Sequence, residues 1–299
     1  MNEPEWTPRV VPPPRAVRRP TVLRGRAHAK VTLSLRVLGM LPGGYHEIDA
    51  LTVAASDPHD DVSLVPQRRG TTVAVTPRGA APALAAHNFA ALAVERLRPH
   101  LPVDAGGMRV RLHKRIPMGA GLGGGSSDAA AVLALLSRHY RVPSRTVARI
   151  AARLGSDVPF GLRGAPVRMR GRGDRLEPVA PFGTRHLVIA TPPFGCSTPL
   201  VYRAWDELGG PASTRVIGSD LDAEGLRNDL EPAALHIAPG LAAFRDAFGA
   251  ATGAEPLMLG SGSSYAVLVA DADAAASGAR RAAAQLGIDT VWAATTLGG

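Results

Sequence analysis

A glycine-rich stretch at residues 117–128 holds the residues whose types and spacing point most directly to chemistry. Five glycines fall within seven positions there, so the backbone can approach a ligand with no Cβ in the way. The next residues, 129–136, are rich in alanine and leucine and predict a buried helix, with Ser126 or Ser127 as its N-cap. We expect Asp128 to cap this helix rather than to act as a base. Free N–H groups and the positive end of a helix dipole attract anions, so the stretch predicts a phosphate-binding loop.

Two common nucleotide motifs do not fit this loop. No Gly-Lys-Ser/Thr follows the glycines, so the lysine of a P-loop is missing. Residues 119–123 begin like a dinucleotide fingerprint, but the third glycine and the downstream acidic residue are out of register. The alternative without function is a turn that only lets a helix pack closely, and such turns rarely need five glycines and two serines.

The elements that must position the loop follow from periodicity. Residues 108–116 alternate apolar and polar side chains, which predicts a strand directly before the loop. The same alternation predicts further strands at residues 22–38, 48–53, 61–65 and 71–76, and apolar spacing predicts a helix at 88–97. The local order is therefore strand, phosphate loop, helix.

Composition divides the chain into three parts. Residues 1–21 are rich in proline and arginine and predict a disordered tail. We expect an N-terminal lobe at 22–190, which carries the phosphate loop. A Thr-Pro-Pro-Phe-Gly turn then opens a second lobe at 191–299, which has its own small-residue loop at 258–264.

Charge and composition exclude several classes of protein. The net charge is +9, but the arginines are spread along the chain and aromatic residues are only 4%, which argues against nucleic-acid binding. No apolar run is long enough to predict a membrane span. A single cysteine, Cys196, excludes an internal disulfide and predicts a reducing, cytoplasmic location.

Only two of the 34 basic residues are lysines, Lys30 and Lys114. Lysine is a compact point charge, whereas arginine is a planar fork, so the two are not interchangeable at a site. Both lysines lie in or beside motifs described below. A codon bias toward arginine with two lysines surviving by chance is the alternative.

Separated motifs along residues 22–297 resemble those of the GHMP kinases, a superfamily of small-molecule kinases, and the glycine-rich stretch resembles the second of them. The others are Ala-Lys-Val-Thr-Leu at 29–33, Pro-Gly-Gly-Tyr-His-Glu at 42–47, Lys-Arg-Ile-Pro at 114–117, Gly-Ser-Asp-Val-Pro-Phe at 155–160, Gly-Arg-Gly-Asp-Arg-Leu at 171–176, Asn-Asp-Leu-Glu at 228–231 and Gly-Ser-Gly-Ser at 260–263. Each motif alone is weak evidence for the family, but this many motifs in the family's order make the resemblance specific. The resemblance is strongest to the branch that phosphorylates a cytidylyl-linked polyol in the non-mevalonate route to isoprenoids.

The resemblance implies a two-lobed α+β fold with ATP in the cleft between the lobes. It also implies a left-handed βαβ crossover in the N-terminal lobe, an exception to the usual right-handed rule, and a ferredoxin-like C-terminal lobe. The expected ligands are ATP with Mg²⁺ and a small-molecule acceptor. We expect no nucleic-acid or membrane partner, and a monomer or homodimer.

Transfer of a phosphoryl group to an alcohol needs positioning, a proton acceptor and stabilisation of charge. Asp157 is the candidate general base and Lys30 the candidate cation beside the transferring group, and the resemblance implies the same two roles. A turn aspartate and a solvated strand lysine are the alternatives. Mg²⁺ would accompany the nucleotide near Ser126 or Ser127, and no carboxylate cluster predicts a metal site built by the protein.

The resemblance also assigns residues to the two ligands. Those expected to bind the nucleotide are Asn88, Lys114, Pro117, Gly119, Gly121, Gly123, Gly124, Gly125, Ser126 and Ser127. Those expected to bind the acceptor are Thr32, Tyr45, His46, Gly260, Ser261 and Gly262. Tyr45 and His46 would bind cytosine, because a tyrosine ring can stack on a base and a histidine can hydrogen-bond to its edge.

Some positions depart from the pattern of that branch. Thr32 stands where asparagine is usual, Gly43 replaces an aspartate, and residues 51–58 lack an aromatic that often follows the turn. These departures concern the acceptor more than phosphoryl transfer. The alternatives are a sibling kinase with another cytidylyl-linked or polyol acceptor, and an inactive nucleotide-binding regulator. Lys30, Asp157 and the intact glycine loop argue against the regulator.

Overall fold

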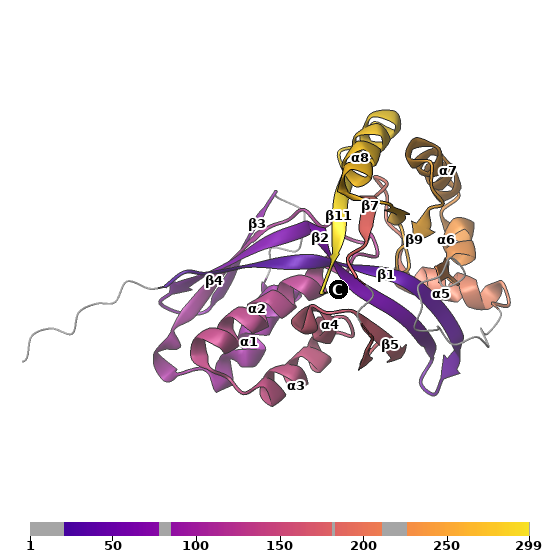
Figure 1. Cartoon of the computed structure of the whole chain (residues 1–299). Coiled ribbons are helices and arrows are strands. Elements are labelled where there is room, and N and C mark those ends of the chain that lie inside the picture. The colour runs from indigo at the N-terminus through magenta and orange to yellow at the C-terminus, as the bar shows by residue number, and fades with distance from the viewer. Residues whose placement is uncertain (1–20, 78–84, 181–182, 211–225, 299) are drawn as a thin grey trace, which may run out of the picture.

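The computed structural model describes residues 21–77, 85–180, 183–210 and 226–298 (Figure 1). The tail expected at residues 1–21 lies, apart from Thr21, outside the described residues. None of the described helices is long and apolar enough to cross a membrane.

Two long antiparallel strands, β1 (Leu23–Leu41) and β2 (Tyr45–Gln67), run across the molecule (Figure 1). The sequence predicted two separate strands at 48–53 and 61–65, which is wrong because β2 continues through the residues between them. Strand β1 pairs with β2 along almost its whole length, and three register shifts accommodate bending of the hairpin. The first half of β2 also pairs with β5 (Val167–Gly171), and the second half pairs with β4 (Gly107–His113).

The remaining N-terminal strands extend this sheet, and the helices of this half cover one side of it. Strand β3 (Thr71–Thr76) is parallel to β4, and α1 (Phe89–Leu97) connects them, which makes a βαβ unit whose left-handedness stays a prediction. Helices α1, α2 (Gly124–Tyr140), α3 (Ser144–Leu154) and α4 (Val158–Arg163) lie below β1 and β2 in Figure 1. Strand β6 (Arg175–Pro178) forms a hairpin with β5, and short 3-10 turns span Ala85–His87, Arg98–His100 and Val103–Ala105.

The C-terminal strands form an antiparallel sheet in the order β11-β7-β10-β9. They are β7 (His186–Ala190), β9 (Leu257–Met258), β10 (Tyr265–Val269) and β11 (Val291–Leu297). The helices of this half are α5 (Thr198–Glu207), α6 (Glu231–Ile237), α7 (Gly240–Thr252) and α8 (Ala272–Leu286). With helices between β7 and β9 and between β10 and β11, this is the ferredoxin-like arrangement. Because β7 pairs with β10 and β11, we propose that the lobe boundary precedes His186 rather than following residue 190.

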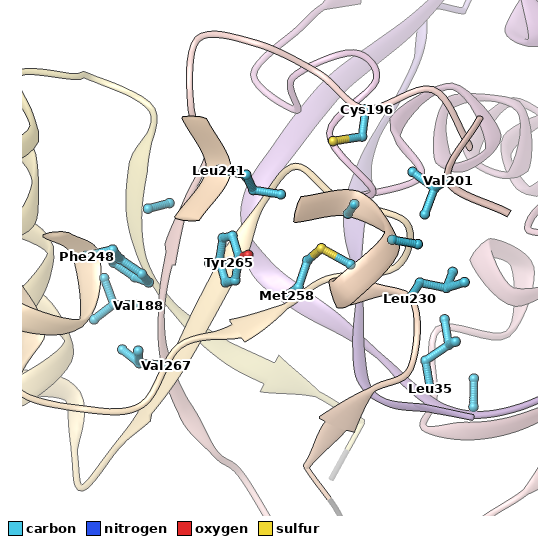
Figure 2. Close-up of a cluster of buried hydrophobic side chains, with 14 of the residues drawn as sticks. Leu35, Val188, Cys196, Val201, Leu230, Leu241, Phe248, Met258, Tyr265 and Val267 are labelled. Atoms are coloured by element: carbon cyan, nitrogen blue, oxygen red, sulfur yellow. The ribbon is translucent and has the colours of Figure 1, made fainter. Parts of the chain in front are cut away.

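The two halves are joined through strands and through a shared core. The last two residues of β11 pair with β2, and β8 (Arg227–Asn228) pairs with β1. A buried cluster around Tyr265 and Phe248 extends through Met258 and Leu230 to Leu35 on β1 (Figure 2). Complete burial of a large apolar side chain contributes about 1.5–3 kcal/mol, so this cluster holds the lobes in a fixed relation.

Candidate functional site

A cavity of about 620 Å³ lies between the two halves. Its floor is the strand surface of β1, β2 and β5, and one wall is the glycine loop with the start of α2. A further wall comes from the C-terminal half, through Thr198, Tyr202, Gly260 and Ser261. The loop at 258–264 therefore reaches the site from the second lobe, as the resemblance implied.

The glycine loop presents the free end of a helix to this cavity. Helix α2 begins at Gly124, with Gly123 in the left-handed conformation (φ +67°) as its N-cap. The expectation that Ser126 or Ser127 is the N-cap is wrong, because the helix already begins at Gly124 and both serines lie within its first turn. A Cβ added to Gly119 or Gly125 would meet no atom within 4 Å, so the backbone there is open to a ligand. The unpaired N–H groups of the first turn thus belong to glycines and small residues.

The other side of the loop is closed by the second small-residue loop. A Cβ on Gly121 would overlap the carbonyl oxygens of Leu259 and Gly262, so this position tolerates only glycine. The N–H of Ser264 donates to the carbonyl of Ala120 at 3.2 Å. These backbone contacts fix the two loops against each other and set the width of the site.

Lys30 and Asp157 meet beside the glycine loop. Lys30 Nζ lies 2.9 Å from Asp157 Oδ2, and the side chains are 14% and 28% exposed. The Lys30 N–H donates to the carbonyl of Leu122 at 2.9 Å, which ties β1 to the loop. Asp157 occupies the N-cap position of α4, yet its side chain makes no capping hydrogen bond. The carboxylate therefore serves the ion pair with Lys30 and not the helix.

Lys114, the other lysine, lies within a buried charge cluster. Its Nζ is 2.5 Å from Asp60 Oδ2 and 2.6 Å from Asp128 Oδ2, and all three side chains are almost wholly buried. Asp60 Oδ1 also accepts the N–H groups of Arg115 and Ile116, at 2.6 and 2.9 Å. The cluster therefore anchors the segment that leads into the glycine loop. Asp128 is the fifth residue of α2, so the expectation that it caps this helix is wrong.

Burial and the neighbouring opposite charges have opposite effects on the pKa values of Lys114 and Asp128. Burial, together with the nearby Asp60 carboxylate, raises the pKa of Asp128 to about 7, although Lys114 acts to lower it. Burial alone would lower the pKa of Lys114, but Asp128 and Asp60 raise it overall. Lys114 therefore stays charged while Asp128 changes protonation near neutral pH.

Tyr45 and His46 lie next to the cavity rather than in its lining. Tyr45 is 56% exposed, and the guanidinium of Arg172, which does line the cavity, lies 5.4 Å from the centre of its ring. His46 stacks on Tyr202 with ring centres 4.6 Å apart, and its Nε2 lies 2.7 Å from Asp206 Oδ1. Burial, with the charge of Asp157 nearby, raises the pKa of Tyr202 to about 12, so this phenol stays protonated.

Most residues named from the sequence meet in the cavity. Those that line it are Lys30, Thr32, Asn88, Lys114, Pro117, Gly119, Gly121, Gly123, Gly124, Gly125, Ser126, Asp157, Gly260 and Ser261. Ser127 is buried in α2, and Gly262, Tyr45 and His46 are outside the lining. Asn88 also caps α1, because its Oδ1 accepts the N–H groups of Ala90 and Ala91.

Sequence reasoning missed other residues of this region. Thr52 and Tyr202 line the cavity, and Asp60 holds Lys114. Thr52 had a usable signal, because it shares the face of Ile48 and Ala50 in the alternation of β2. Neither Tyr202 nor Asp60 had one, since each reaches the site only through long-range packing.

The fold and the cavity define a small-molecule kinase of the GHMP type. The model of the GHMP kinases N terminal domain matches residues 88–165, which contain the glycine loop and Asp157. Mevalonate kinase from L. major, a structure with R-mevalonate bound, superposes with a TM-score of 0.64 over 94% of this chain and 97% of that chain. Its 17% sequence identity makes this a likeness of fold.

Relatives of higher sequence identity show which GHMP kinases this chain resembles in sequence as well as in fold. A 4-diphosphocytidyl-2-C-methyl-D-erythritol kinase from Pelotomaculum thermopropionicum is 38% identical over 87% of this chain and 93% of its own length. Another from Rhizobium johnstonii is 35% identical over 84% of this chain and 87% of its own length. A crystal structure of 4-(cytidine 5'-diphospho)-2C-methyl-D-erythritol kinase matches with a TM-score of 0.77 and 35% identity, over 93% of this chain and 100% of that chain. The chain belongs to the 4-diphosphocytidyl-2-C-methyl-D-erythritol kinase family, within the GHMP kinases.

Proposed function

We propose that the protein transfers the γ-phosphoryl group of ATP to the 2-hydroxyl of 4-diphosphocytidyl-2-C-methyl-D-erythritol. The observation that carries this proposal is the Lys30–Asp157 ion pair, 2.9 Å long, beside the open N-terminus of α2 in a cavity between two lobes. The relatives named for this reaction align over most of the chain, which supports the choice of acceptor.

The residues of the site divide the reaction between them. Asp157 accepts the proton of the acceptor hydroxyl. Lys30 pairs with Oδ2 of this carboxylate, so Oδ1 is the oxygen that takes the proton. The hydroxyl oxygen then bonds to the γ-phosphorus while the bond to the oxygen bridging the β- and γ-phosphates breaks, and ADP leaves. Lys30 stabilises the negative charge on the transferring group.

We assign the phosphates of ATP to the glycine loop. The left-handed Gly123 and the open space at Gly119 and Gly125 form a backbone cradle that side chains would fill. The described residues hold no cluster of three or more His, Cys, Asp or Glu side chains that could bind a metal. Mg²⁺ would therefore be carried mainly by the phosphates and water, and the roles of Lys30 and Asp157 do not depend on it. Because the reaction consumes ATP, we place it in the cytoplasm.

Gly125→Ala tests the phosphate cradle. The added methyl meets no protein atom within 4 Å and improves helix propensity in α2, so Tm should stay equal or rise slightly. The same methyl projects where the phosphates would lie, so KM for ATP should rise on the order of tenfold while KM for the acceptor stays constant. Steady-state kinetics and thermal melts check both expectations.

Gly240→Ala is the matched control for this variant. Gly240 is also in the first turn of a helix, α7, outside the cavity, and a Cβ there makes only an ordinary 3.6 Å contact with Phe194. Its kinetic constants should equal those of the wild type. An unchanged KM for ATP in Gly125→Ala would place the phosphates elsewhere.

We assign the cytosine to the region of Tyr45, His46 and Tyr202. Three aromatic rings and the Arg172 guanidinium gather there, and Tyr202 and Arg172 also face the cavity. His46 already contacts Tyr202 and Asp206, so a base would bind against this preformed group rather than against a free histidine.

Tyr45→Ala should raise KM for the cytidylyl acceptor roughly threefold to tenfold, because an aromatic stacking contact is worth about 0.5–1.5 kcal/mol. KM for ATP should not change. Tyr45→Phe keeps the ring and should behave as the wild type. If Tyr45→Ala also keeps its acceptor KM, the base does not stack on this ring.

A sibling kinase with another polyol acceptor is the second candidate. Thr32 stands in the cavity floor where asparagine was expected, and Thr52 lies beside it. ADP release measured with a panel of cytidylyl-linked and simple polyols separates the two candidates. Turnover confined to another polyol would overturn the proposed acceptor, and ATP binding without turnover on any of them would favour a regulator. The oligomeric state, monomer or homodimer, stays a prediction.

A further inference from the structure

The hydroxyl of Thr52 is buried without a hydrogen-bond partner in the described part of the chain. The residue is 0% exposed, and it lines the cavity between the lobes. Burial of a polar group without a partner costs free energy, so such groups are rare in folded proteins. An unused hydroxyl at the wall of a binding cavity points to a partner that arrives with the ligand.

The strand register places Thr52 beside the reacting groups. Thr52 on β2 is directly opposite Thr32 on β1, and Lys30 is opposite Ala54 two residues further along β2. Alternation along each strand puts Lys30, Thr32 and Thr52 on the same face of the sheet, toward the cavity. Thr52 therefore neighbours Thr32 across the strands, and Thr32 is the next residue after Lys30 on the same face of β1.

Among the described residues of this floor, Thr32 carries a second hydroxyl, but only that of Thr52 is buried without a partner. The other described side chains that β1, β2 and β5 contribute to the lining, besides Lys30 and Thr32, are apolar: Leu35, Ile48, Ala50 and Met169. The glycine loop, to which we assign the phosphates of ATP, forms a separate wall. The strand floor is therefore the surface that remains for the polyol acceptor. A polyol has hydroxyls beside the one that is phosphorylated, and each of them can donate and accept a hydrogen bond.

We infer that Thr52 is a specificity residue that hydrogen-bonds to a second hydroxyl of the polyol acceptor, next to the one that is phosphorylated. This inference rests on the proposed function and adds a contact to it. The Thr52 hydroxyl selects polyols that carry a hydroxyl neighbouring the reactive one, because an acceptor without it leaves the buried threonine unpaired.

Thr52→Val removes the hydroxyl and keeps the branched shape. KM for 4-diphosphocytidyl-2-C-methyl-D-erythritol should rise roughly threefold to tenfold, the effect of losing one hydrogen bond, while KM for ATP stays constant. Tm of the ligand-free protein should stay equal or rise, because no protein partner in the described residues loses a bond. Thr52→Ser restores a hydroxyl and should bring the acceptor KM back toward the wild-type value.

Ser34→Ala is the matched control. Ser34 is also 0% exposed, and its hydroxyl on β1 has no partner among the described residues, but it does not line the cavity. Its removal should leave both KM values unchanged. An equal rise in acceptor KM for Ser34→Ala would mean that loss of any buried hydroxyl in the hairpin disturbs the site, and this would overturn the inference.

Analogues of the acceptor identify the contact. The 1-deoxy and 3-deoxy forms each lack one neighbour of the 2-hydroxyl, and one of them should bind equally well to wild type and Thr52→Val. An unchanged acceptor KM in Thr52→Val, or a rise in both KM values with a lowered Tm, would overturn the inference and leave the proposed function standing. If the wild type does not turn over this acceptor, the proposed substrate is wrong. The inference is then tested with the polyol that the panel identifies, and an unchanged KM for that polyol in Thr52→Val would overturn it.

Discussion

Asp157→Asn should lower kcat by a factor of about 10² to 10⁴, the usual contribution of a general base, while the protein still binds ATP. Asparagine has nearly the same shape as aspartate but cannot accept the proton of the acceptor hydroxyl. The phosphate cradle is made of backbone groups of the glycine loop, and asparagine keeps the shape of the side chain beside Gly123, so ATP affinity should be kept. ADP release gives kcat, and calorimetry with ATP gives the Kd.

The control for this variant is Asp246→Asn, the same chemical change at an exposed residue of α7 that pairs with Arg245 outside the cavity. It should leave both kcat and the Kd for ATP unaltered. Full turnover by Asp157→Asn would remove Asp157 from the mechanism. A simultaneous loss of ATP binding would instead mean that the Lys30–Asp157 pair holds the loop in shape.

The parts of the site that sequence predicted best are those with local signals. A loop with five glycines before an Ala/Leu-rich helix shows its geometry within a dozen residues, and the structure places it on the cavity. Lys30 and Asp157 are far apart in the chain, and no spacing rule brings them together. Only the ordered set of motifs pointed to their meeting, which the 2.9 Å ion pair confirms.

Long-range pairing accounts for what the sequence did not predict. Lys114 lines the cavity, and its contact with the nucleotide stays a prediction, but its two carboxylate partners were not predicted, and one of them, Asp60, lies 54 positions away in the chain. Strand β2 was expected as two strands, because Pro58 and the polar residues around it interrupt the apolar pattern at its middle. Continuous pairing with β1 outweighs that local interruption.

Lys114→Met should destabilise the protein strongly. It leaves the carboxylates of Asp60 and Asp128 buried without their cation, and breaking such a pair typically costs about 3–5 kcal/mol. For a protein of this size we expect Tm to fall by roughly 10 °C. Arg111→Met on the exposed face of the same strand, β4, is the control and should change Tm little. A Tm for Lys114→Met close to that of the wild type would contradict the role of the cluster.

Asp128→Asn separates the charge of the cluster from its hydrogen bonds, since asparagine still offers an oxygen to Lys114. The pKa of Asp128 rises from 3.8 to about 7 on folding, chiefly through burial, so the folded state keeps a proton that the unfolded state has lost. The stabilisation from this proton is complete below about pH 4 and disappears as the pH rises to about 7. Asparagine does not titrate, so Tm of the variant relative to wild type should increase between these pH values and then level off. A difference in Tm that does not increase between these pH values would show that the Lys114 ammonium keeps Asp128 ionised in the folded protein, and the cluster would then act as a permanent ion triad.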